Sequence, residues 1–136
     1  MPNYMVDSSV WIDFFNKRKT NQVEKLKSLI PNTVTTGYIY LLPIIVQEIL
    51  QGINDDYYFK VVQENLFGFR RLEPEPYELA LESVDLYRML RKKGQTIRKA
   101  NDCIIAAACI EHKFTLIHND KDFNSIAKHT SLKIYK

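Results

Sequence analysis

Several features are scarce in this sequence of 136 residues, and each scarcity excludes a class of protein. The four glycines lie far apart, so the chain has neither the GxGxxG turn of dinucleotide-binding folds nor a Walker A phosphate loop. The longest uninterrupted apolar stretch, residues 38–46, includes a proline and is far shorter than the roughly 20 residues that a transmembrane helix needs. The first residues lack the basic and apolar segments of a secretory signal. We therefore expect a cytoplasmic protein without membrane contact.

Cysteine and net charge are also modest. The only cysteines, Cys103 and Cys109, fall on different sides of an expected helix and cannot bridge there. No clustered His and Cys residues indicate zinc, so both are expected to be buried thiols in a reducing compartment. Lys and Arg number 19 and Asp and Glu 16, which gives a net charge of +3. No block of like charges is long enough to form a strongly charged tail.

Short apolar runs alternate with helical patterns along the chain. Strands are expected at residues 4–6, 33–36, 69–72, 115–117 and 132–135. Helices are expected at residues 10–15, 21–30, 43–53, 55–66, 77–93, 101–112 and 122–128. The clearest helix, at 77–93, has an apolar face that we expect to be buried, formed by Tyr77, Ala80, Leu81, Val84, Tyr87 and Leu90. The alternation predicts one α/β domain over residues 1–136 with a mainly parallel sheet, in which residues 43–66 form a helical hairpin.

Four acidic residues stand where an α/β sheet builds its sites. Asp7 directly follows the first expected strand, and Asp120 follows the fourth after two further residues. Asp102 lies in the first turn of the apolar helix before that fourth strand, and Glu48 lies on an otherwise apolar helix face. Ligand sites of open α/β sheets lie at the carboxyl ends of the strands. Carboxylates that converge there repel one another unless a cation neutralises them, and oxygen-only ligands select Mg²⁺ or Mn²⁺ over zinc.

Each of these acids also has a purely structural explanation. Asp7 is a candidate cap of the following helix, and either Asp102 or the asparagine before it is a candidate cap of the next. Asp120 and Asp122 are candidate turn residues, and Asp122 can cap the last helix. Glu48 can simply face solvent or an arginine. The residues alone leave these alternatives open.

Four segments together resemble the motifs of the PIN-domain ribonucleases, and more closely those of the VapC toxins of toxin–antitoxin pairs. The segments are Tyr4–Asp13, Pro43–Gly52, Ala100–Ala108 and Leu116–Phe123. They occur in the order and at the spacing typical of the family, and the resemblance covers nearly the whole chain. It implies a PIN-like three-layer α/β/α sandwich with a central, mainly parallel sheet.

The resemblance also implies roles for individual residues. The residues that match the acidic quartet of the family, which is catalytic and holds one or two Mg²⁺ or Mn²⁺ ions, are Asp7, Glu48, Asp102 and Asp120. Ser9 matches the polar residue that supports the first acid. His118 stands where the family has Thr or Ser, and three roles are open to it: a structural histidine, a hydrogen-bond partner that orients Asp120, or a group that makes metal binding pH-dependent. Asp122 is the reserve ligand if Asp120 is only a turn residue.

The implied activity is hydrolysis of RNA phosphodiester bonds by an endoribonuclease that acts as a toxin. Arg98 and Lys99 lie shortly before Asp102, where they either bind substrate phosphate or pair with nearby acids. Members of the family form homodimers and are inhibited by a cognate antitoxin protein. Residues 43–66 are richer in apolar and aromatic side chains than a solvated hairpin needs, which suits a dimer or antitoxin contact. Outside the acidic quartet the chain is distinctly basic, which suits a polyanionic substrate.

Three alternatives fit these residues less well. A non-catalytic PIN-like module that binds RNA or protein has no need of an intact acidic quartet. A phospho-accepting receiver domain needs adjacent acids after the first strand, where this chain has a single acid followed by Ser8 and Ser9. A phosphatase of the haloacid dehalogenase type needs a second Asp at the position of Ser9.

Overall fold

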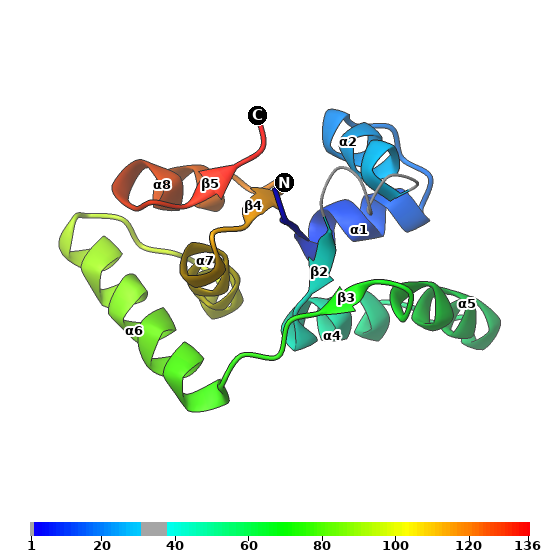
Figure 1. The fold of residues 1–136 in the computed structure, drawn as a ribbon, viewed down its shortest axis with the longest axis horizontal. Helices are drawn as coiled ribbons and strands as arrows, with labels where there is room; N and C mark the ends of the chain where they lie inside the picture. Colours follow the sequence, from blue (N-terminus) through cyan, green and yellow to red (C-terminus); the bar gives the residue numbers. More distant parts are fainter. Residues whose placement is uncertain (1, 31–37) are drawn as a thin grey trace.

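The structure, a computed structural model that describes residues 2–30 and 38–136, is organised around a parallel sheet (Figure 1). The strands of the described residues are β1 (Tyr4–Val6), β2 (Ile39–Leu41), β3 (Arg70–Arg71), β4 (Thr115–Ile117) and β5 (Lys133–Ile134). All neighbouring pairs are parallel, and the strand order is β3-β2-β1-β4-β5. β1 is buried along its whole length, because it has a paired strand on either side.

Helices cover both faces of this sheet and give the fold three layers. They are α1 (Ser8–Phe15), α2 (Asn21–Leu29), α4 (Pro43–Gln51), α5 (Asp56–Leu66), α6 (Pro76–Lys92), α7 (Ala100–His112) and α8 (Lys121–His129). α1 and α2 lie on one side of the sheet, and α6 and α7 lie on the other (Figure 1). α4 packs against α1 and α5 against α4, whereas α8 packs against α7 and β5. The predicted α/β/α sandwich with a parallel sheet is confirmed.

The order of the strands reverses at β1. The chain passes from β1 to β2 on one side and returns, after α6 and α7, to β4 on the other side. A crevice opens at the carboxyl ends of the strands at such a switch point, because the connections leave the two neighbouring strands in opposite directions. Asp7 follows β1 and Asp120 follows β4, so the topology brings both residues to this edge.

α7 is the most deeply buried helix of its layer. Its alanines at positions 106–108 are almost fully enclosed, and their small side chains let α6 pack closely against it. Both cysteines are free and buried in this helix, as predicted. Burial raises the pKa of both thiols, to about 11 for Cys103, so they stay protonated at neutral pH and are poor nucleophiles.

The face that α6 buries differs from the prediction. Tyr77, Leu81 and Val84, expected in the core, are 80%, 67% and 51% exposed. The buried side chains of α6 are Ser83, Leu86 and Leu90. Ser83 fits this position because its hydroxyl donates a hydrogen bond to the carbonyl of Leu79 at 2.7 Å. A serine in the buried stripe makes that stripe look polar in the sequence. For this reason the predicted face is wrong at Tyr77, Ala80, Leu81 and Val84, although Leu90 is buried as predicted.

Some element boundaries also differ from the prediction. β2 was not predicted, because its residues belong to a continuous apolar run without alternation. The strand predicted at residues 33–36 lies outside the described residues. The strands predicted at 69–72 and 132–135 are each reduced to two residues, β3 and β5. No helix in the described part of the chain combines the length and the apolarity that crossing a bilayer requires.

Candidate metal centre

Asp102 carries a buried carboxylate that receives little stabilisation from the surrounding protein. It lies in the first turn of α7 and is only 4% exposed. α7 begins after Lys99 without a side-chain capping bond, so the alternative that Asp102 or Asn101 serves as the helix cap is wrong. Asp102 Oδ2 is buried and has no hydrogen-bond partner among the described residues. A buried carboxylate oxygen without a partner is costly, so this position favours a proton or a cation.

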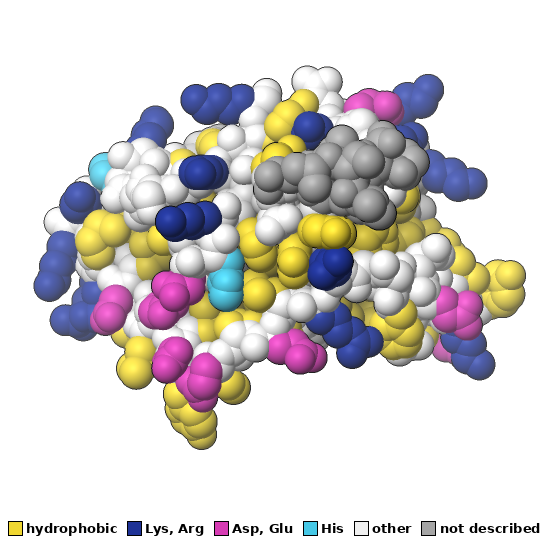
Figure 2. Space-filling model, viewed as in Figure 1, with side chains coloured by type: hydrophobic (Ala, Val, Ile, Leu, Met, Phe, Trp, Pro, Cys, Tyr) yellow, Lys and Arg dark blue, Asp and Glu magenta, His cyan; other side chains and the backbone are white. Residues whose placement is uncertain are grey.

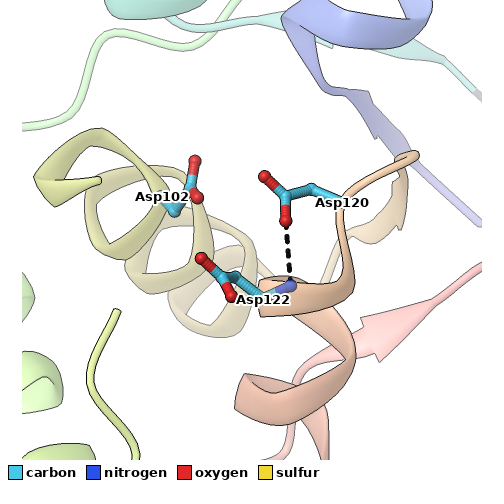
Figure 3. A group of neighbouring side chains, drawn as sticks. All are labelled: Asp102, Asp120 and Asp122. Carbon is cyan, nitrogen blue, oxygen red and sulfur yellow. Dashed lines mark hydrogen bonds between the residues drawn. The ribbon is translucent and has the colours of Figure 1, made fainter. Parts of the chain in front are cut away.

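Asp120 and Asp122 bring two further carboxylates to Asp102. One carboxylate oxygen of each residue lies within 4.8 Å of those of the other two. Figure 3 shows the three side chains pointing toward a common space from α7 and from the start of α8. Asp120, and not Asp122 as predicted, is the cap of α8: its Oδ1 accepts a hydrogen bond from the Asp122 backbone N–H at 2.9 Å. Capping uses one oxygen of Asp120, so the turn role and a role as ligand are compatible.

Asp7 lies beside this trio at the end of β1. Its carboxylate caps α1, as the structural alternative supposed, and accepts hydrogen bonds at Oδ2 from the hydroxyl of Ser9 at 2.6 Å and from its backbone N–H at 3.3 Å. Burial raises the pKa of Asp7, although the bonds from Ser9 oppose the shift. Both bonds fall on one oxygen, and Ser9 therefore fixes the orientation of Asp7.

Glu48 reaches the same edge from α4. Its Oε1 accepts a hydrogen bond from the Ser8 hydroxyl at 3.1 Å, and its Oε2 accepts one from Asn101 Nδ2 at 3.3 Å. The alternative that Glu48 faces only solvent or an arginine is therefore wrong. Ser8 and Asn101 were not predicted to take part in the site. The only available signal is their position, since each is the chain neighbour of one of the acids.

His118 takes the place of the Thr or Ser that is usual two residues before the fourth acid. It is 5% exposed, and its Nδ1 accepts a hydrogen bond from the Asp120 backbone N–H at 3.1 Å. A Thr or Ser hydroxyl makes the same short-range bond to a backbone N–H two residues on. Burial lowers the pKa of His118, although the nearby Asp7 and Asp120 oppose this. The ring is thus neutral near pH 7, with its proton on Nε2, and it supports the backbone of Asp120.

Arg98 and Lys99, the predicted substrate-binding pair, contact the acids directly. Lys99 Nζ lies 3.1 Å from Asp120 Oδ2. Arg98 Nε lies 3.4 Å from Asp122 Oδ2, and its Nη2 lies 3.9 Å from Asp120 Oδ1. Both cations are more than half exposed, whereas the two carboxylates are nearly buried. Two roles were predicted for Arg98 and Lys99, namely binding of substrate phosphate or pairing with nearby acids. The structure shows the pairing.

The carboxyl groups of the site differ in pKa. Burial raises the pKa of Asp102 to about 7; Lys99 opposes the shift, and Asp7, Asp120 and Asp122 add to it. Burial also acts to raise the pKa of Asp120, but the Asp122 N–H and Lys99 outweigh it and lower that pKa. One carboxyl of the trio therefore has a pKa near neutrality while its neighbour stays ionised, and a divalent cation among the three carboxylates would favour the ionised form of both.

The residues present fit a divalent cation. One carboxylate oxygen from each of the three residues lies within 4.8 Å of the other two, and Asp102 Oδ2 is buried and has no hydrogen-bond partner among the described residues. The donor set contains oxygen only, which suits hard cations such as Mg²⁺ and Mn²⁺. Asp7 and Glu48 flank the trio, and both hydrogen bonds from Ser9 to Asp7 use Oδ2.

This fold and this acidic edge define a class of protein. The family profile described as "PIN domain" matches residues 4–129, and the chain belongs to that family, as the four motifs predicted. Among its curated relatives are the VapC ribonuclease Mb1587 of Mycobacterium bovis and Ribonuclease VapC11 of Mycobacterium tuberculosis. Each is 29% identical over 129 residues, which cover 95% of this chain and 95% of the relative.

Solved structures share the whole fold. The DNA-bound VapBC of Salmonella typhimurium superposes with a TM-score of 0.75 at 18% identity, over 99% of this chain and 98% of the other. VapBC-1 of nontypeable Haemophilus influenzae gives a TM-score of 0.73 at 22% identity, over 98% and 96%. At such low identity these likenesses establish a common fold and leave the residues of the site to be argued from their own geometry.

Proposed function

We propose that this chain is a metal-dependent endoribonuclease of the VapC kind, acting as the toxin of a toxin–antitoxin pair. The observation that carries the proposal is the convergence of Asp102, Asp120 and Asp122 around an unpartnered buried oxygen at the switch point of a PIN fold. The curated relatives, which match nearly the full length of the chain, are named as ribonucleases. Fold, acidic edge and relatives thus support the same activity.

The catalytic ion is Mg²⁺ or Mn²⁺, held by Asp102 and Asp120 with Asp7 and Glu48 completing the acidic quartet. Asp122 is the third carboxylate within reach. A bound divalent ion lowers the pKa of coordinated water and neutralises charge on the phosphate under attack. Ser9 fixes Asp7, and Ser8 and Asn101 fix Glu48, so that the carboxylates are oriented before the ion arrives.

RNA is the substrate. The described residues of the site include no histidine pair for metal-free cleavage, since His118 is buried and its Nδ1 accepts the Asp120 N–H. Arg98 and Lys99 are the cations nearest the acids, and more than half of each side chain is exposed, so they are available to approaching phosphates. Phosphate contacts of this kind position a nucleic acid without reading its sequence.

A cognate antitoxin is the protein partner, and both act in the cytoplasm. Structural neighbours of this chain are VapBC toxin–antitoxin complexes. The apolar hollow between α4, α5 and β3 has a volume of about 380 Å³ and suits an apolar segment of the antitoxin; its lining includes Leu42, Val46, Leu50, Leu66 and Phe67. Arg71 at its margin adds a cation that an acidic residue of the partner can meet. Of the two roles predicted for residues 43–66, dimer or antitoxin contact, this hollow supports the antitoxin contact.

A homodimer forms along α6. Tyr77, Leu81 and Val84 make an exposed apolar stripe on this helix. Acidic residues lie in its N-terminal part and basic residues in its C-terminal part: Glu75, Glu78, Glu82 and Asp85, then Arg88, Arg91, Lys92 and Lys93. Figure 2 shows acidic side chains toward the lower left and basic side chains along the left edge, over the part of the molecule where Figure 1 has α6. Antiparallel pairing of two α6 helices about a two-fold axis joins the apolar stripes and brings acidic ends to basic ends.

The alternative, a non-catalytic PIN-like binding module, is less consistent with this geometry. Such a module has no use for three converging carboxylates, one of them with an unpartnered buried oxygen. Burying these groups lowers the stability of the protein and does not improve the binding of RNA or protein. RNA binding without metal-dependent turnover by the purified protein would favour it.

The test is cleavage of RNA by the purified protein with Mg²⁺ or Mn²⁺. Wild type is expected to cut, EDTA to stop cutting, and Asp102→Asn to lower the rate at least about 100-fold, because the variant cannot neutralise the ion in the same way. Asp56→Asn, an exposed acid of α5, serves as the matched control and is expected to behave as wild type. Cleavage by Asp102→Asn at the wild-type rate would contradict the proposal.

A further inference from the structure

Lys99 occupies the open side of the acidic trio. Its Nζ lies 3.1 Å from Asp120 Oδ2, while Asp120 Oδ1 accepts the Asp122 N–H. Both carboxylate oxygens of Asp120 are therefore engaged by this chain's own donors. A ligand oxygen from Asp120 becomes available to a divalent ion only when Lys99 withdraws or shares it.

The position of Lys99 follows from the start of α7. Lys99 has an extended backbone, and its carbonyl accepts the N–H of Asp102 at 3.0 Å. Its side chain makes no capping bond and is free to reach across to Asp120. The ion pair with Asp120 raises the pKa of Lys99, so the ammonium is fully charged at neutral pH. Lys99 is thus tied through the backbone to one acid of the trio and through its side chain to another.

We propose that Lys99 is an internal counter-ion, which holds Asp120 in the metal-free protein, competes with the divalent ion for it, and moves to the substrate phosphate when the ion binds. The inference rests on the proposed function, because it takes the acidic trio as the metal site. Lys99 then sets two properties in opposite directions: it weakens the binding of the ion and strengthens the binding of RNA.

The physical basis is charge balance. In the metal-free protein one ammonium is the closest cation to Asp120, and Arg98 supplies a second, longer contact to Asp122. A divalent ion within the trio repels a lysine a few ångströms away, so occupation by both is unfavourable. The Lys99 side chain is 59% exposed, and a displaced ammonium reaches the solvent side of the edge, where the phosphates of an incoming RNA lie.

Arg98 is the weaker competitor of the two. Its contacts with Asp122 and Asp120 are 3.4 and 3.9 Å long, against 3.1 Å for Lys99. Removal of Arg98 should therefore change metal affinity less than removal of Lys99. This ranking separates a specific competition by Lys99 from a general effect of positive charge near the site.

The experiment is a titration of the metal-free protein with Mn²⁺ by calorimetry, without RNA. Lys99→Met and Lys99→Gln are expected to bind Mn²⁺ about five- to tenfold more tightly than wild type at low ionic strength, because a competing charge is gone. Lys99→Arg keeps the charge and is expected to stay within about twofold of wild type. Lys27→Met is the matched control: Lys27 also pairs with an acid, Glu24, at 3.8 Å on the remote α2, and its removal should leave the affinity unchanged.

Cleavage kinetics at saturating Mn²⁺ provide the second measurement. Lys99→Met is expected to raise the KM for RNA several-fold, since the displaced ammonium no longer meets the phosphate, while its metal affinity rises. If Lys99→Met and Lys99→Gln both bind Mn²⁺ no more tightly than wild type, the proposed competition between Lys99 and the ion is wrong. An unchanged KM would overturn the move to the substrate.

Failure of the proposed function gives a different result. Asp102→Asn is expected to weaken Mn²⁺ binding at least about tenfold, because it removes a ligand charge of the trio. If Asp102→Asn binds Mn²⁺ as tightly as wild type, the trio is not the metal site, and both the proposed function and the inference on Lys99 are wrong. If Asp102→Asn loses the ion but the Lys99 variants do not gain affinity, only the inference on Lys99 falls.

Discussion

The side-chain amide of Asn101 donates a hydrogen bond of 3.3 Å to Glu48 and so ties the start of α7 to α4, across 53 positions of the chain. Ser8 donates to the other oxygen of the same carboxylate from the start of α1. Glu48 is thus fixed from two helices at once. The residues next to Asp7 and Asp102 in the sequence serve to place a third acid.

Replacing Asn101 should therefore impair metal binding without unfolding the protein. Asn101→Ala leaves Glu48 with one hydrogen bond, and a loss of about tenfold in Mn²⁺ affinity is expected from the removal of such an orienting contact. Calorimetric titration of the metal-free variant measures it, and the unfolding temperature serves as the check on structure. Asn119→Ala, which removes a bond of 3.2 Å to the partly buried Asp13, is the control and should leave the affinity unchanged.

Asp102→Asn should stabilise the metal-free protein at neutral and alkaline pH. The pKa of Asp102 is about 7 in the folded state, against 3.8 in the unfolded chain. Between these values the unfolded chain loses its proton first, so the contribution of Asp102 to the free energy of unfolding falls as the pH rises from about 4 to about 7. Asp7, Asp120 and Asp122 face this carboxyl and add to the effect, whereas Lys99 opposes it.

The measurement is the unfolding free energy of wild type and variant from pH 4 to pH 8. The difference in favour of Asp102→Asn should be near zero at pH 4 and reach on the order of 1–3 kcal/mol above pH 7, since each unit of pKa shift corresponds to about 1.4 kcal/mol and solvent relaxes part of it. Mn²⁺ should then stabilise wild type more than the variant. A constant difference across this range would show that Asp102 does not titrate as described.

His118→Thr should keep the stability of the fold, and His118→Leu should lower it. Both His118 Nδ1 and a threonine hydroxyl can accept the Asp120 N–H, whereas leucine leaves that donor without its acceptor. Loss of the acceptor should cost about 1–3 kcal/mol of unfolding free energy, measured by urea denaturation. Equal stability of the two variants would mean that the hydrogen bond contributes nothing.

The pKa shift of His118 adds a pH dependence of the opposite sign to that of Asp102. Burial lowers the folded-state pKa of His118 below its ordinary value of 6.5, against the pull of Asp7 and Asp120. The unfolded chain then takes up the proton first as the pH falls. Stability from neutral His118 is present above about pH 6.5 and is lost progressively below it. His118→Thr should flatten this acid limb of the stability profile.

Leu81→Asp should abolish the proposed homodimer. Leu81 is 67% exposed at the centre of the apolar stripe on α6, so a charge there opposes pairing without disturbing the core. Sedimentation or light scattering measures the mass of each variant. Tyr57→Asp on α5 is the control, since Tyr57 is equally prominent, 77% exposed, and lies on another helix. A Leu81→Asp variant that stays dimeric would place the interface elsewhere.

Much of the fold was predictable because local signals were strong. The strands at 4–6 and 115–117 are continuous apolar runs that end at polar residues, and the structure has them at the predicted positions. Pro43 marks the start of α4, where its missing N–H costs nothing. The buried face of α6 was not predictable, because Ser83 satisfies its hydroxyl within the helix and masks the buried stripe. Only packing against α7 distinguishes the two faces.

The acidic residues themselves follow from the sequence, since an acid after a buried strand or within an apolar helix stands out against its surroundings. The sequence by itself determined the α/β class, the parallel sheet and the candidate acids, because these depend on periodicity and on neighbours along the chain. The tertiary structure alone decided which carboxylates converge, that Asp120 caps α8 while facing Asp102, and that Lys99 holds Asp120. The physical reason is that charge interactions act through space, between residues that folding brings together from four separate segments.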